Sequence, residues 1–134
     1  MEVQDLILAD YAAANDRGKF TLVGAGFSRI ETQKVPLIHS SMFILVRLKV
    51  TMADKGKNKL EIRIVGEKGS IFKAEGDVDV STDHANEEYL PLPIHIANLK
   101  FDHLGVYNIE VSINGEPKKS HFLTIMEKTA GVSA

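Results

Sequence analysis

Alternation of apolar and polar residues runs along most of this chain, and it constrains the fold more than any other feature. Within the stretch 106–113, the apolar residues Tyr107, Ile109, Val111 and Ile113 alternate with polar ones. Because successive strand side chains point to opposite faces, this stretch is predicted to be a strand with one buried side. Asn114-Gly115 follows at once, and this pair best tolerates the positive φ angles of a type I′ turn. The segment 119–126 is predicted to return as the second strand of a hairpin.

The same pattern, with clusters of Gly, Asn, Asp, Lys and Pro as separators, predicts about eight strands. Helical periodicity over three turns is absent from the sequence, so the predicted fold class is all-β. Strands that bury one face favour an antiparallel β-sandwich, immunoglobulin-like or a close variant, with a closed barrel as the alternative. A length of 134 residues suits one domain, predicted to span 1–134. The predicted strands are 5–14, 19–29, 42–52, 59–66, 71–80, 89–99, 105–113 and 119–127.

The predicted strand at 89–99 carries two prolines, Pro91 and Pro93. Proline has no N–H to donate to a neighbouring strand. This strand is therefore predicted to lie at the edge of a sheet or to be irregular.

Composition excludes several kinds of chemistry. The chain has no cysteine, which removes thiol nucleophiles, disulfides, iron–sulfur clusters and cysteine zinc sites. Its formal net charge of −2 argues against a nucleic-acid partner, because such proteins usually carry a basic excess. The longest apolar run is the segment 42–46, far short of the roughly 20 residues of a membrane helix, and the acidic opening does not resemble an export signal. We therefore expect a cytoplasmic protein without a membrane partner.

Motifs for catalysis or cofactor binding are weak. Gly24-Ala25-Gly26 begins like a dinucleotide-binding loop, but Arg29 stands where the third glycine belongs and no βαβ pattern surrounds it. The five histidines lack metal-site spacing, and the serines lack a nucleophile-elbow motif. We therefore predict no catalytic residue, no metal ligand and no cofactor, and we expect that the chain is not an enzyme.

An acidic stretch at 75–88 is the main alternative to this view. Residues 74–90 contain six acidic side chains and no Lys or Arg. Carboxylate oxygens are the ligands of calcium, but an EF-hand needs glycine at the position that Thr82 occupies. A solvated strand face and loop explains the stretch most simply. The alternative is a loop-based ligand or metal site around Asp83 and His84, and a small hydrolase is weaker still.

The N-terminal strands and the strand at 42–52 are apolar on both faces. One face meets the core, so the other must meet a loop, a second subunit or another protein, because large apolar patches usually mark interfaces. The separator at 15–18 is predicted to be a hairpin loop. Asp10 stands within an apolar strand, where an unpaired carboxylate is costly; the alternative is that it accepts hydrogen bonds from a neighbouring turn. The candidate interaction residues are Asp10, Tyr11, Phe43, Leu45, Asp83 and His84.

Two stretches carry a family resemblance. The opening, Leu8-Ala9-Asp10-Tyr11-Ala12 followed by Gly18-Lys19 and Gly24-Ala25-Gly26, is similar to an uncharacterised family of small bacterial proteins. The ending, 104–116, resembles both that family's tail and the last hairpin of many immunoglobulin-like sandwiches. The resemblance implies an all-β cytoplasmic domain of unknown function and transfers no catalytic residue. Family members often carry cysteine at position 9, and the Ala9 of this chain counts against chemistry there.

These observations together favour a non-catalytic interaction or structural module. We expect it to act through a sheet face or edge, either by self-association as a homo-oligomer or by binding another protein. The loop-based ligand or metal site described above is the alternative function.

Overall fold

Strands make up nearly all regular structure in the described part of the chain, which comprises residues 1–15, 17–81 and 88–128 of a computed structural model. A short 3-10 turn, η1 (Met52–Asp54), is the only helical element in these residues, and none of their helices is long and apolar enough to pass through a bilayer. The all-β prediction is confirmed. The strands are β1 (Glu2–Ala9), β2 (Tyr11–Ala14), β3 (Phe20–Val23), β4 (Arg29–Thr32), β5 (Leu37–Val50), β6 (Gly56–Gly66), β7 (Gly69–Val80), β8 (Glu88–Phe101), β9 (Gly105–Ile113) and β10 (Glu116–Glu127).

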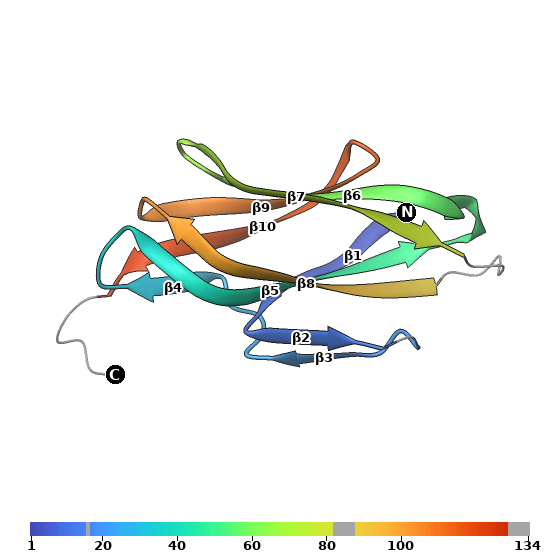
Figure 1. Cartoon of the computed structure of the whole chain (residues 1–134), viewed down its shortest axis with the longest axis horizontal. Coiled ribbons are helices and arrows are strands. Elements are labelled where there is room, and N and C mark those ends of the chain that lie inside the picture. The colour runs from blue at the N-terminus through green and yellow to red at the C-terminus, as the bar shows by residue number, and fades with distance from the viewer. Residues whose placement is uncertain (16, 82–87, 129–134) are drawn as a thin grey trace.

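Two larger sheets face each other across a common apolar core (Figure 1). One sheet has the order β1-β5-β8, and the other has the order β4-β10-β9-β6-β7. Leu8 and Ile44 of the first sheet and Ile62, Ile109 and Leu123 of the second belong to one buried cluster. The core therefore lies between the sheets, while the immunoglobulin-like form of the sandwich stays a prediction.

The predicted strands from 42–52 to 119–127 are present as β5 to β10, most of them longer than expected. β8 is an edge strand of the three-stranded sheet, as Pro91 and Pro93 predicted. The turn between β9 and β10 has positive φ at both Asn114 (52°) and Gly115 (81°), which confirms the predicted turn chemistry.

The first two predicted strands were wrong in their extent. The strand expected over 5–14 breaks at Asp10 into β1 and β2, and the strand expected over 19–29 ends at Val23. Gly24 and Gly26 cause the second break, because their positive φ angles of 60° and 88° leave the extended conformation. β2 and β3 still pair as an antiparallel hairpin, as predicted.

β4 was not predicted, and it changes the sheet type. It pairs parallel with β10, with Ile30 opposite Ile125. The five-stranded sheet is therefore mixed rather than purely antiparallel, which corrects the expectation of an all-antiparallel fold. A four-residue strand bounded by Gly26 and Pro36 gives too short an alternation to be recognised in the sequence.

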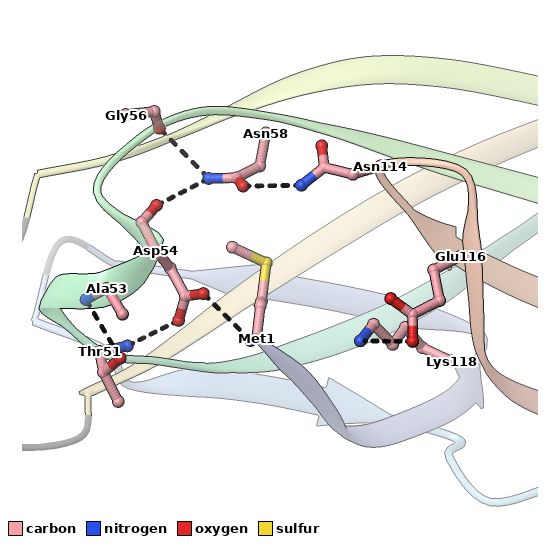
Figure 2. A network of polar contacts seen from close by, with 9 residues as sticks. All are labelled: Met1, Thr51, Ala53, Asp54, Gly56, Asn58, Asn114, Glu116 and Lys118. Atoms are coloured by element: carbon pink, nitrogen blue, oxygen red, sulfur yellow. Dashed lines mark hydrogen bonds and ion pairs between the residues drawn. The ribbon is translucent and has the colours of Figure 1, made fainter.

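The crossover from β5 to β6 joins the two sheets through η1 (Figure 2). Thr51 caps this turn: its hydroxyl accepts a hydrogen bond from the Ala53 N–H, and its own N–H donates to the Asp54 carboxylate at 2.9 Å. The Met1 amino group lies 3.0 Å from the same carboxylate. Burial by itself raises the pKa of Asp54, but the Thr51 N–H and the Met1 ammonium outweigh it, so the pKa falls below its ordinary value.

Two asparagines extend this network to the β9–β10 turn (Figure 2). The Asn58 amide donates to the Asp54 carbonyl at 2.9 Å, and the Asn114 amide donates to the Asn58 side-chain oxygen at 3.0 Å. The Lys59 N–H in turn donates to the Asn114 side-chain oxygen at 2.8 Å. Polar contacts therefore join the β5–β6 crossover to the β9–β10 turn at one end of the molecule.

Candidate functional site

The β2–β3 hairpin lies against the outer face of the three-stranded sheet and forms a third layer (Figure 1). Ala9 and Leu45 point to this outer face, yet neither is exposed to solvent. Ala12 on β2 is buried with them. The apolar face that the sequence left without a partner is thus covered by a hairpin of the same chain, and Leu45 is not available to a partner as an exposed residue.

Asp10 lies at the joint between β1 and β2, where it is exposed. Its N–H donates to the carbonyls of Val23 and Gly24, at 3.0 and 3.3 Å, and its side chain lies directly against the Gly24 backbone. The expectation that Asp10 stands inside an apolar strand was therefore wrong, because the strand ends before it. Its position explains how the hairpin leaves the sheet.

Tyr11 and Phe43, two of the candidate interaction residues, are in contact. Their rings meet edge to face with centroids 5.4 Å apart, and Phe43 stacks on His95 of β8 at 4.6 Å. The His95 Nε2 lies 2.8 Å from the Ser41 hydroxyl oxygen. Tyr11 is exposed and Phe43 half-buried, so these rings form one rim of the hairpin layer.

Arg47 forms the other rim and was missed in the sequence. Its guanidinium lies 3.0 Å from the Asp5 carboxylate and 4.1 Å from the centre of the Tyr89 ring. The Phe20 ring of β3 lies further away, at 5.9 Å. Such cation–π contacts contribute about 0.5–1 kcal/mol each at partly exposed sites. Arg47 therefore joins all three strands of the sheet to the hairpin, a role that depends on contacts between distant segments.

Asp83 and His84 lie outside the described residues, so the structure does not place them. Within the ranges that it does describe, no three His, Asp or Glu side chains are grouped as metal ligands. The loop-based ligand or metal site stays a prediction.

The most exposed large apolar side chain is on the opposite side of the molecule. Phe122 of β10 is 65% exposed, and Val106 of β9 (49%) and Met126 of β10 (40%) lie on the same outer face of the five-stranded sheet. Phe122, Thr124 and Met126 share one face because strand side chains repeat every two residues. We call Val106, Phe122 and Met126 the β9–β10 patch.

A model of a family of unknown function, DUF6941, matches residues 4–126. This chain belongs to the DUF6941 family. No curated protein and no solved structure matches it. The predicted resemblance to an uncharacterised family is confirmed, whereas a bacterial origin stays a prediction.

Membership of DUF6941 assigns no function to any residue, so the surface of this chain supplies the argument. Sequence reasoning named Tyr11 and Phe43 as candidates without predicting their contact, and it left open which segment covers the outer face of the three-stranded sheet. The β9–β10 patch had a signal in the sequence: Phe122 interrupts the polar face of β10, at a position that alternation assigns to solvent. Sequence analysis did not use this signal, an apolar residue among the polar, solvent-facing positions of a strand.

Proposed function

We propose that this DUF6941 chain is a non-catalytic interaction module that acts through a sheet face. The exposed Phe122 side chain in the β9–β10 patch is the observation that carries the proposal. Burial of apolar area contributes roughly 25 cal/mol per Å², so covering this patch contributes favourably to association. The lack of cysteine is compatible with a reducing cytoplasm as its location.

The favoured partner is a second copy of the chain. A two-fold interface brings the same surface of each subunit together, so it needs a surface that is complementary to itself. Charges of both signs flank the β9–β10 patch: Arg29 and Glu31 on β4 lie opposite Thr124 and Met126 of β10. An arginine of one copy and a glutamate of the other can therefore pair at the edge of the apolar contact.

Light scattering after size exclusion, over a range of protein concentrations, tests this proposal. We expect a dimer that Phe122→Thr converts to monomer, since threonine keeps the strand preference and removes the ring. Tyr11→Thr is the matched control, because it removes an exposed ring from the hairpin layer instead. A wild-type chain that stays monomeric at high concentration contradicts self-association. If only Tyr11→Thr abolishes the dimer, the dimer contact lies at the β2–β3 hairpin instead of the β9–β10 patch.

A further inference from the structure

The two facing sheets separate along the side where β7 and β8 are their edge strands. A cavity of about 290 Å³ opens between these strands, and an adjoining one of about 320 Å³ shares Asp77, Val78 and Leu92 with it. We call the two cavities together the β7–β8 groove; Asn15 and Gly18, between β2 and β3, line its end near Asp79. Its apolar walls are Leu60, Ile62, Val78, Leu90, Leu92 and Ile94.

The two edges of the groove differ in what their backbones offer. β8 carries Pro91 and Pro93, which lack the N–H groups that a further strand needs. β7 contains no proline, and within the described residues its only paired neighbour is β6. An uncovered edge of this kind is a template for an additional strand. The β7 backbone is therefore the side of the groove to which an extended segment can pair.

The groove also has room for side chains beside β7. Gly76 lies opposite Leu60 in the β6–β7 register and lines the groove. A Cβ built on Gly76 meets no atom within 4 Å, so the space in front of the strand is open. The groove follows β7 from Ala74 to Asp79, a length of about 20 Å at roughly 3.3 Å per residue.

The charges on β7 indicate the partner's chemistry. Glu75, Asp77 and Asp79 point away from the core, on the face of the strand opposite to Val78. Glu75 is engaged within the chain: hydrogen bonds from Lys59 and Lys73, at 3.0 and 3.2 Å, lower its pKa. Asp77 contacts Lys57 only at 4.0 Å, and Asp79 is exposed. A strand placed beside β7 would therefore meet a mainly acidic row.

We infer that the β7–β8 groove binds an extended segment of another protein in which apolar and basic residues alternate. The segment adds to β7 as a further strand, with its apolar side chains in the groove and its Lys or Arg side chains beside Asp77 and Asp79. Opposite charges directly across two strands are favourable and like charges are not. A second β7 would place acidic side chains against acidic ones, which disfavours a second copy at this edge.

Fluorescence anisotropy with a labelled, capped peptide of about seven alternating Lys and Val residues tests the inference on the full chain. We expect binding, and we expect weaker binding of a peptide with the same composition in which Lys and Val form blocks. Gly76→Leu places a side chain in the groove, where its Cβ meets no atom within 4 Å, and it occupies the space that the peptide's apolar side chains need. Its predicted effect is a loss of binding of about tenfold or more, with folding preserved.

A charge-reversal pair tests the acidic row separately. Asp77→Lys with Asp79→Lys is expected to weaken the Lys-Val peptide about tenfold and to strengthen a Glu-Val peptide. Asp102→Lys with Glu116→Lys makes the same change in net charge at exposed positions that do not line the groove, and it serves as the matched control. Equal effects of the two pairs mean non-specific attraction and overturn the inference.

Hydrogen exchange decides whether the peptide adds as a strand. Pairing with β7 slows the exchange of its backbone amides, whereas adsorption by charge alone leaves them unchanged. Unchanged exchange in β7, or wild-type affinity in Gly76→Leu, overturns the inference. If the wild-type chain is a dimer and Gly76→Leu converts it to a monomer, a second copy of the chain occupies the groove. That result also overturns the inference. None of these outcomes depends on the β9–β10 patch.

Discussion

The chain bends at Asp10, and the bend depends on the residue that Asp10 faces. Gly24 has a φ of 60°, and a Cβ on it would overlap the Asp10 carboxylate. The absence of a side chain at position 24 lets the end of β1 approach the end of β3. Two residues far apart in sequence thus determine where the hairpin leaves the sheet.

Replacing Gly24 with alanine is expected to destabilise the protein by more than the backbone strain alone. The left-handed conformation costs a non-glycine residue roughly 1–2 kcal/mol, and the overlap with Asp10 adds to this. Gly26→Ala is the matched control, because Gly26 has a φ of 88° but no atom within 4 Å of its Cβ position. Urea denaturation measures both. Equal losses for the two variants would show that Asp10 does not pack against Gly24 in solution.

At the scale of elements, the β2–β3 hairpin is what makes the outer face of the three-stranded sheet a buried surface. Leu45 points away from the main core, yet it is 0% exposed because the hairpin covers it. Contacts at two rims hold the hairpin on the sheet. One rim is the Tyr11–Phe43 ring contact, and the other is Arg47 with Asp5, Tyr89 and Phe20. The hairpin is therefore a layer of the fold rather than a surface loop.

Leu45→Ala tests this layer. Truncation of a fully buried leucine costs about 2–5 kcal/mol, so we expect a large loss in the free energy of unfolding. Ile38→Ala on the same strand is the control, since Ile38 is 61% exposed and its loss should be small. Denaturant unfolding of both variants gives the comparison. Similar costs would mean that the hairpin does not cover the sheet in solution.

At the scale of the molecule, the crossover around Asp54 ties the two sheets together at one end. The carboxylate holds the Thr51 N–H and the Met1 amino group at once, and the Asp54 carbonyl continues the network through Asn58 to Asn114 (Figure 2). The negative charge of Asp54 is therefore more favourable in the folded chain than in the unfolded chain. The ionised Asp54 carboxylate thus contributes to the stability of the fold.

Acid should weaken this contribution in a defined direction. Because folding lowers the pKa of Asp54 from 3.8, its contribution is present above pH 3.8 and is lost as the pH falls through the lower, folded value. Asp54→Asn is expected to lose about 1 kcal/mol at neutral pH and to converge with the wild type in acid. Urea unfolding at both pH values measures this, with the exposed Asp79→Asn as control. A constant difference across pH would contradict the ionic role.

The strands of this protein follow from its sequence because alternation is a property of neighbouring residues. Alternation located β5 to β10. The two prolines of β8 predicted its edge position, and the Asn114-Gly115 pair predicted the turn between β9 and β10. Alternation missed β4, because four residues between a glycine-rich bend and Pro36 carry too little pattern. It also missed Arg47, whose partners come from three other strands, and it left open which segment covers the second apolar face of β5.

By itself, the sequence determined that this chain forms strands with one apolar side, because the parity of each side chain is set by residues next to it. The tertiary structure alone decided which faces are covered, because covering a face requires segments distant in the chain to meet. Leu45 is buried by a hairpin that precedes it, and Ile30 pairs with Ile125 almost at the other end of the chain. Phe122 stays exposed because no such segment reaches it among the described residues.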